Sequence, residues 1–238
     1  MPKILDFKKP KNSLEIRSKA NNTAEIIIYG PIGSGFWDDS AVSAKQFNEE
    51  LKKLDSTVNH IELRLNSPGG DVFDGVAIYN RLKQHKAKVT VYIDGLCASI
   101  ASIIALAGDE VIMGEGALYM IHLPWTWSYG NRTDFENVIN RLQDIEEQML
   151  SIYAKKSKLD KTEIRAMLEK ETWLDADQAI EHGFVDKKSE ETLAIAASVF
   201  DKATWINKAP KNFKSQTKEI QSEITKIKEK VSGYLARK

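Results

Sequence analysis

Cysteine is nearly absent from this chain: its 238 residues contain one, Cys97, so no disulfide can form within the chain. A lone thiol is typical of proteins in a reducing compartment. Long apolar runs are missing too, since no window approaches the roughly 18 uninterrupted apolar residues of a membrane-spanning helix. The N-terminus also lacks the apolar core of a signal peptide. These absences predict a soluble, cytoplasmic protein that does not enter a membrane.

The chain also lacks an excess of either charge and the spacings of common metal and nucleotide motifs. Its formal net charge is zero, so the composition gives no reason to expect a nucleic-acid partner. It has four histidines and neither H-E-x-x-H nor C-x-x-C, which argues against a metal site. The P-loop signature G-x-x-x-x-G-K-[ST] is absent as well. We therefore expect no metal and no cofactor.

What the sequence does contain is an alternation of strand-like and helical patterns. The expected strands are 14–17, 24–29, 61–65, 88–93, 111–113 and 118–121, and the expected helices are 40–54, 72–82 and a segment directly after Ser99. Strands separated by helices of this length are typical of βαβ units and of a buried, largely parallel sheet.

Two later segments have a different pattern. Apolar residues in 134–153 recur at steps of three and four, a narrow seam that favours packing against another helix, either within the domain or in an oligomer. Residues 201–238 hold ten Lys/Arg against four Asp/Glu, and 201–216 has the composition of a linker. We expect an N-terminal segment with the first hairpin strand at 1–23, a main domain at 24–190, and a linker with a basic amphipathic helix at 191–238.

The stretch 89–99 is the most informative part of the main domain. β-Branched and aromatic residues give way to small ones at Gly95, and the stretch ends in Ser99 before an apolar helical segment. At such a junction, unpaired N–H groups and the positive end of the helix favour a developing negative charge. Ser99 is therefore a candidate nucleophile. The alternative is that its hydroxyl merely caps the helix.

A nucleophilic serine needs a base, and His122 follows 23 residues later at the end of the next apolar strand. A tetrahedral intermediate also needs N–H donors around its oxyanion. Gly70, at another strand-to-helix turn, and Ile100, directly after the serine, would supply one backbone N–H each. Together these residues indicate acyl transfer.

Other polar residues fit structural roles better. Cys97 is the rival nucleophile, but a reactive thiolate needs a lowered pKa, and we expect a packed thiol. Ser102 is expected to face the protein interior. Asp175 precedes a short helix that ends at Gly183, so it is interpreted as a helix cap. The remaining histidines are expected on the surface or in loops: His60, His85 and His182.

A base histidine works best when an acid fixes its tautomer and stabilises the imidazolium. The candidate acid is Glu171, in a turn between two helices and beside the apolar pair Trp173 and Leu174. From spacing alone, the alternative that Glu171 is a solvated loop carboxylate stays open.

Four motifs, in this order, resemble the proteolytic subunit of Clp protease over about residues 24–188. They are Asn-Ser-Pro-Gly-Gly at 66–70, Gly-Leu-Cys-Ala-Ser at 95–99, Met-Ile-His-Leu-Pro at 120–124 and Ala-Ile-Glu-His-Gly-Phe-Val-Asp at 179–186. The resemblance implies an α/β ClpP/crotonase-like fold of repeated βαβ units, with a protruding handle helix at about 134–157. It also implies ring-shaped homo-oligomers that enclose the active sites and cleave protein substrates.

The resemblance also implies roles for individual residues. Ser99 would be the nucleophile, His122 the base, Glu171 the acid at the family's aspartate position, Gly70 and Ile100 the oxyanion donors, and Gly69, Leu123 and Pro124 substrate-binding residues. Three departures stand out: glutamate replaces aspartate, the family's axial loop that contacts the ATPase is not recognisable in 1–23, and a basic tail is added.

With Gly-Pro-Ile-Gly at 30–33, these departures look more like the Clp-related head maturation proteases of tailed phages and prophages. That resemblance implies capsid or scaffold proteins as substrates, in the bacterial host cytoplasm or the phage prohead, with no unfoldase required. The leading hypothesis is thus a serine endopeptidase that is ATP-independent or partner-dependent. The alternatives are a general ClpP-like protease working with an ATPase, an acyl-CoA hydratase or thioesterase relative, and a catalytically vestigial assembly scaffold.

Overall fold

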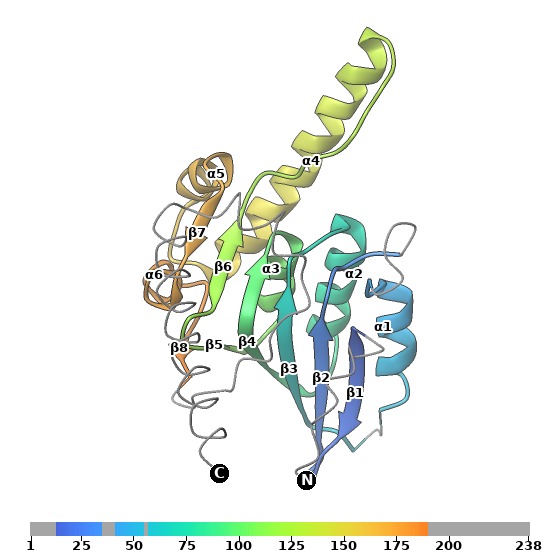
Figure 1. The fold of residues 1–238 in the computed structure, drawn as a ribbon, viewed down its shortest axis with the longest axis vertical. Helices are drawn as coiled ribbons and strands as arrows, with labels where there is room; N and C mark the ends of the chain where they lie inside the picture. Colours follow the sequence, from blue (N-terminus) through green and yellow to red (C-terminus); the bar gives the residue numbers. More distant parts are fainter. Residues whose placement is uncertain (1–12, 35–40, 55–56, 190–238) are drawn as a thin grey trace, which may run out of the picture. The chain divides into compact units, whose positions relative to one another are not determined.

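The computed structural model of the chain describes residues 13–34, 41–54 and 57–189. The linker and basic helix expected at 191–238 lie outside these residues, as do residues 1–12 of the expected N-terminal segment. Within the described part, the βαβ units and the long helix that the sequence predicts are both present (Figure 1).

Eight strands of the described residues form one mixed sheet. They are β1 (Leu14–Ser18), β2 (Thr23–Tyr29), β3 (His60–Ser67), β4 (Lys88–Ala98), β5 (Glu110–Met113), β6 (Leu118–Ile121), β7 (Thr172–Leu174) and β8 (Lys187–Lys188). The main order is β1-β2-β3-β4-β5-β8, and β6 pairs with both β4 and β7. The pairing is parallel except at β1–β2 and β6–β7, which are antiparallel.

The helices of the described residues connect these strands. They are α1 (Ala44–Leu51), α2 (Val72–Lys83), α3 (Ile100–Ala105), α4 (Arg132–Lys156), α5 (Lys161–Glu169) and α6 (Ala176–His182). Local sequence signals fix several ends: Asp175 forms a capping box with Gln178, as its interpretation as a cap predicts, and Gly183 ends α6 with φ 81°. Helices α1, α2 and α3 lie against one face of the sheet (Figure 1).

The sheet is largely parallel, as expected, but among the described residues its two faces differ in burial. In β2 and β3, buried aliphatic side chains such as Ile26 and Leu63 alternate with partly exposed ones such as Glu25, Glu62 and Arg64. Strands with period-two alternation bury one face only. Among the described residues, the face opposite the helices is therefore polar.

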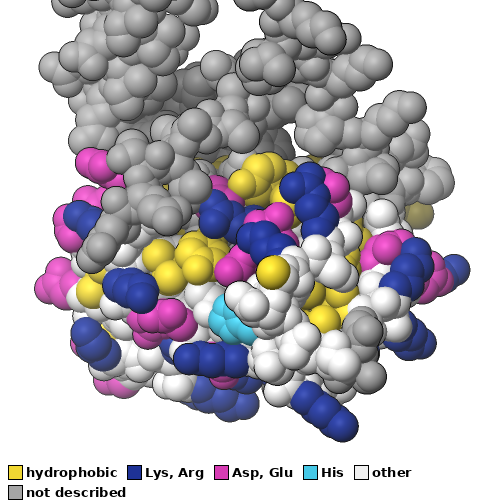
Figure 2. Space-filling model, turned by 90° about the horizontal axis from the view of Figure 1, so that it is seen from below, with side chains coloured by type: hydrophobic (Ala, Val, Ile, Leu, Met, Phe, Trp, Pro, Cys, Tyr) yellow, Lys and Arg dark blue, Asp and Glu magenta, His cyan; other side chains and the backbone are white. Residues whose placement is uncertain are grey.

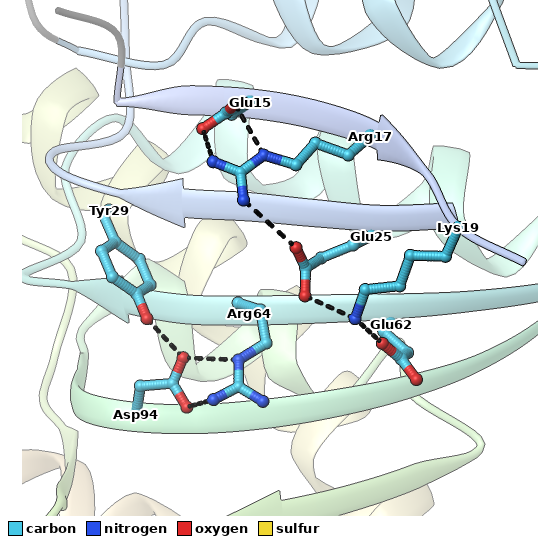
Figure 3. Close-up of polar contacts among 8 residues, drawn as sticks. All are labelled: Glu15, Arg17, Lys19, Glu25, Tyr29, Glu62, Arg64 and Asp94. Carbon is cyan, nitrogen blue, oxygen red and sulfur yellow. Dashed lines mark hydrogen bonds and ion pairs between the residues drawn. The ribbon is translucent and has the colours of Figure 1, made fainter. Parts of the chain in front are cut away.

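Charged side chains pair with one another across this polar face (Figure 3). The Arg64 guanidinium donates two hydrogen bonds to Asp94, of 2.8 and 2.6 Å, and the Tyr29 hydroxyl donates a third of 2.6 Å. Lys19 bridges Glu25 and Glu62 at 2.7 and 2.6 Å. These pairs join β2, β3, β4 and the turn that follows β1. In the described part of the chain, ion pairs therefore stabilise this second face, and no helix covers it.

Strand β4 is longer than the sequence predicts, which is a correction to the expected end at residue 93. The chain bulges between Ile93 and Cys97 and then resumes pairing with β3. The first part of β4 pairs with β5 and the second part with β6. The Asn66 side chain accepts a 2.9 Å hydrogen bond from the Leu96 N–H, which satisfies the bulged backbone. A change of neighbour thus extends the strand through Gly95 up to Ala98.

Among the described residues, helix α4 packs against the rest of the domain only through its C-terminal half. Met149, Leu150 and Tyr153 are buried, whereas Phe135 and Ile139 in its first half are 47% and 54% exposed. Figure 1 shows this first half extending beyond the end of the sheet. Of the apolar seam predicted for 134–153, Ile145, Met149 and Ile152 therefore pack on the core, whereas Phe135 is exposed.

Figure 2 shows the end of the sheet at which the parallel strands begin, opposite to the end beyond which α4 extends. Lys and Arg side chains intermingle there with Asp and Glu, and apolar side chains lie between them, so neither charge dominates the visible described surface. None of the described helices is long and apolar enough to cross a membrane.

Candidate active site

Ser99 lies at a sharp turn between β4 and α3. Its backbone has φ 57° and ψ −128°, a conformation that side-chain-bearing residues rarely adopt and that costs about 1–3 kcal/mol. Its N–H donates a 2.9 Å hydrogen bond to the carbonyl of Met120 on β6. The hydroxyl makes no capping bond to the helix, which removes the support for the N-cap interpretation.

His122 directly follows β6, which runs parallel to the end of β4. Because Ala98 pairs with Met120, the residues that follow each strand emerge side by side. His122 Nε2 lies 2.8 Å from Ser99 Oγ, a hydrogen-bond distance. The His122 side chain is 17% exposed, so the ring is largely shielded from water.

Glu171 reaches His122 through a strand that the sequence did not predict. β7 pairs antiparallel with β6, with Thr172 opposite Ile121, so the next residues in register are Glu171 and His122. Glu171 Oε2 lies 3.8 Å from His122 Nδ1, longer than a hydrogen bond, and the carboxylate is 37% exposed. Glu171 has φ 50°, a left-handed conformation that turns it from α5 into β7.

The glycine pair at the start of α2 lies against the serine. A Cβ atom placed on Gly69 would be 2.6 Å from Ser99 Cβ and 3.1 Å from the Ile100 nitrogen. The Gly69 N–H is held by the Ser67 hydroxyl at 3.1 Å. A Cβ on Gly70 would collide with the Ile32 carbonyl oxygen, 1.9 Å away. Close backbone approach therefore requires glycine at both positions.

In the described part of the chain, the N–H groups of the two expected oxyanion donors are available to a substrate. Among the contacts of the described residues, neither the Gly70 nor the Ile100 N–H donates a hydrogen bond. Ile100 is the first residue of α3, where an N–H has no partner within the helix. Gly70 is exposed and Ser99 partly exposed, so a carbonyl substrate has access to this corner.

The expected substrate-binding residues after His122 begin a segment without regular secondary structure. Leu123 and Pro124 are partly buried, and the Leu123 N–H donates a 3.2 Å hydrogen bond to the Leu168 carbonyl. Beyond them, a set of aromatic side chains that sequence reasoning overlooked is 72–87% exposed: Trp125, Trp127 and Tyr129. Their alternate spacing in the sequence is the signal of an extended segment that could have revealed them.

The other residues considered as catalytic candidates lie where they serve the structure of the protein. Cys97 is buried, and burial raises the pKa of its thiol, which disfavours the nucleophilic thiolate. Ser102 is fully buried, as expected. Of the other three histidines, His85 lies in the loop between α2 and β4, as expected, whereas His60 belongs to β3 and His182 to the last turn of α6; all three are partly buried. Residues 13–34, 41–54 and 57–189 contain no cluster of His, Cys, Asp and Glu suited to a metal ion.

Comparison with known proteins identifies the family of this chain. The model of the Clp protease family matches residues 8–192. The chain is 32% identical to the ATP-dependent Clp protease proteolytic subunit of Leuconostoc citreum over 180 residues, covering 74% of this chain and 88% of the relative. The corresponding subunit of Lactococcus lactis is 29% identical over 186 residues, covering 76% and 90%.

A solved structure gives the same result for the fold. A ClpP1 point mutant from Listeria monocytogenes superposes with a TM-score of 0.61 at 25% identity, covering 71% of this chain and 92% of that chain. This likeness confirms the predicted ClpP fold. The matched family range leaves out the residues beyond 192. By its sequence and its fold, the chain belongs to the Clp protease family, whose relatives here are peptidases.

Proposed function

We propose that this protein is a serine endopeptidase in which Ser99 is the nucleophile and His122 the general base. The observation that carries the proposal is the 2.8 Å contact between His122 Nε2 and Ser99 Oγ at a strained strand-to-helix turn. A strained turn that lifts a serine hydroxyl into a substrate site is a recurring feature of serine hydrolases. Family membership supports peptide-bond hydrolysis as the reaction.

In the first step, Ser99 Oγ attacks the substrate carbonyl carbon while His122 Nε2 takes the hydroxyl proton. This requires the tautomer of His122 with its proton on Nδ1. The Gly70 and Ile100 N–H groups then donate to the oxyanion of the tetrahedral intermediate. Because neither N–H has another partner among the described residues, both can serve without breaking an existing bond.

In the second step, protonated His122 gives its proton to the leaving amine, and the peptide bond breaks to leave an acyl-enzyme. Water, deprotonated by His122, then hydrolyses the ester and restores the Ser99 hydroxyl. Glu171 faces Nδ1 of His122 and stabilises the imidazolium that forms in both steps. At 3.8 Å its contribution is electrostatic in the resting site, and a small side-chain movement would bring it to hydrogen-bond distance.

Covalent labelling tests the proposal directly. Purified protein and Ser99→Ala are incubated with a fluorophosphonate probe and, separately, with unfolded β-casein. We expect the parent protein to be labelled on Ser99 and to cleave casein, and the variant to do neither. Casein cleavage by Ser99→Ala at the parent rate would contradict the assignment. Mass spectrometry of the same samples also shows whether the chain processes its own 191–238 segment.

We further propose that the first half of α4 contacts a second copy of the chain in a ring-shaped homo-oligomer. The exposed Phe135 and Ile139 support this, because large apolar side chains on a projecting helix favour association. Sedimentation velocity of the double variant Phe135→Ser/Ile139→Ser should show smaller particles than the parent protein. The exposed Asn140 provides the control Asn140→Ser, and equal sedimentation of all three proteins would contradict this contact.

The choice of substrate protein is a separate proposal. Capsid or scaffold proteins follow from the motif departures noted in the sequence, whereas the curated relatives are ATP-dependent Clp proteolytic subunits. We keep both candidates, and the test is cleavage of folded against unfolded proteins without any ATPase. Cleavage of an assembled capsid-type substrate alone favours head maturation. Cleavage of unfolded chains alone favours a general Clp-type protease. The division into segments 1–23, 24–190 and 191–238 also stays a proposal, which limited proteolysis tests.

A further inference from the structure

A buried series of hydrogen bonds connects α4 to the backbone of Ser99. The Ser102 hydroxyl donates a hydrogen bond to the Ser99 carbonyl oxygen, and the Ser102 N–H donates another of 3.0 Å to the same oxygen. The Tyr153 hydroxyl, on α4, lies 2.6 Å from Ser102 Oγ. Since the proton of Ser102 is engaged by a carbonyl, which is an acceptor alone, Tyr153 must be the donor in that pair.

These groups are shielded from water. Ser102 and Tyr153 are both 0% exposed. Burial raises the pKa of the Tyr153 hydroxyl, which keeps its proton available for donation. Hydrogen bonds in a chain polarise one another, and in a low-dielectric interior each is stronger than in water. The arrangement holds the Ser99 carbonyl oxygen toward the core with two donors.

The consequence follows from the planarity of the peptide bond. The Ser99 carbonyl and the Ile100 N–H belong to one trans peptide, so they point in opposite directions. An oxygen fixed toward the core therefore turns the Ile100 N–H outward, on the side where Gly69 approaches the Ile100 nitrogen. We propose that Tyr153 and Ser102 are positioning residues that fix this peptide plane and so aim the Ile100 N–H at the oxyanion.

This inference rests on the proposed function, and it assigns a task to two residues outside the Ser99–His122 pair. The turn at Ser99 is strained, so its peptide plane would rotate if nothing held it. The side chain of Ser99 makes no capping bond that could hold it. The Ser102–Tyr153 chain supplies the restraint from the core, through the one end of α4 that is buried.

Fluorophosphonate labelling gives a readout that needs no known substrate, because the phosphoryl oxygen of the probe occupies the oxyanion position during attack. We expect Tyr153→Phe to lower the second-order labelling rate about 10-fold, and Ser102→Ala/Tyr153→Phe about 100-fold, the effect typical of losing one oxyanion donor. The pH at which labelling reaches half its plateau should not move, because His122 is untouched. The double variant removes both hydroxyls together, so it leaves neither unpaired and should fold.

Tyr119→Phe is the matched control. Tyr119 is also 0% exposed, and its hydroxyl donates a 2.8 Å bond to the Ser102 carbonyl, not to that of Ser99. It should lose stability as Tyr153→Phe does but keep the parent labelling rate per folded molecule. Parent-rate labelling of folded Tyr153→Phe and of the double variant would overturn the proposal. If the parent protein itself is no better labelled than Ser99→Ala, the proposed function has failed instead.

Discussion

His122 Nδ1 and Glu171 Oε2 are 3.8 Å apart, whereas the other ring nitrogen of His122 lies 2.8 Å from Ser99 Oγ. The base is thus bonded to the nucleophile more closely than to its acid. Glu171 also accepts a hydrogen bond of 3.3 Å from the Trp173 indole, which holds the carboxylate beside β7. The distance between Glu171 and His122 determines how strongly the activity should depend on Glu171.

Glu171→Gln should reduce kcat by about 10- to 100-fold, less than the roughly 10⁴-fold that follows when a hydrogen-bonded orienting acid is changed to an amide. The reason is that a partly exposed carboxylate at 3.8 Å stabilises the imidazolium only modestly. Steady-state cleavage of casein measures the effect. An unchanged kcat would move the acid role to another residue and leave Ser99 and His122 in place.

Ser99→Ala should abolish labelling and lower kcat by about 10⁴- to 10⁶-fold, as the loss of a triad member does in other serine proteases. His122→Ala should do the same, since neither residue works without the other. Both rates are compared with the parent protein on one casein preparation. Residual cleavage that survives further purification of Ser99→Ala would point to a second nucleophile.

Ser99→Gly should be more stable than Ser99→Ala by about 1 kcal/mol, although both are inactive. The backbone at residue 99 has φ 57° and ψ −128°, where a residue with a Cβ is strained and glycine is not. Urea unfolding of the two variants measures the difference. Equal stability, or a more stable alanine variant, would show that the turn relaxes once the hydroxyl is gone.

Gly69→Ala should lower both stability and activity, with a loss of about 100-fold in kcat for a displacement of the serine near 1 Å. Its Cβ would lie 2.6 Å from both Ser99 Cβ and the Ala98 carbonyl oxygen, so the serine turn must move. Gly116→Ala is the control, because φ is 75° there but no atom lies within 4 Å of the added Cβ.

Gly116→Ala should cost about 1–2 kcal/mol for its left-handed backbone and leave kcat unchanged. If Gly69→Ala behaves like this control, the close approach of Gly69 to Ser99 does not matter for the reaction.

Arg64→Leu should destabilise the fold by roughly 3 kcal/mol at neutral pH, because it leaves Asp94 charged and without its ion pair. The side chains of Arg64 and Asp94 are 17% and 10% exposed. Burial already raises the pKa of Asp94, and Arg64 and Tyr29 oppose that rise. Without Arg64 the pKa of Asp94 rises further in the folded state.

The sign of the pH dependence follows from that shift. A folded-state pKa above the unfolded value means that the folded protein binds more protons, so the free energy of unfolding falls as pH rises through this range. The loss caused by Arg64→Leu should therefore be smaller near pH 4 than at pH 7 in urea unfolding. Arg64→Leu/Asp94→Leu, which buries no unpaired charge, should recover part of the stability. If Arg64→Leu lowers the free energy of unfolding equally at pH 4 and pH 7, the proposed role of Asp94 is wrong.

Much of the fold was predictable because its signals are local. The strands and helices along 14–121 could be predicted from the periodicity of apolar residues. The ends of α6 could be predicted from the cap at Asp175 and the glycine at 183. Ser99 and His122 could be named as candidates because each follows an apolar strand, and parallel neighbours bring their carboxyl ends together. The extension of β4 was missed because Gly95 looks like a strand breaker until β3 and β6 pair with the residues beyond it.

The sequence by itself determined which side chains could carry the chemistry: one serine at a strand-to-helix junction, one histidine after a strand, and glycines where the backbone must come close. The tertiary structure alone decided how they meet. The three-residue β7 is too short to be predicted from its sequence pattern, yet its pairing with β6 brings Glu171 to His122. Likewise, Ser102 and Tyr153 are 51 residues apart, and only the packing of α4 under the serine turn joins them. Contacts of this kind depend on which distant segments pair, and local propensity carries no information about that choice.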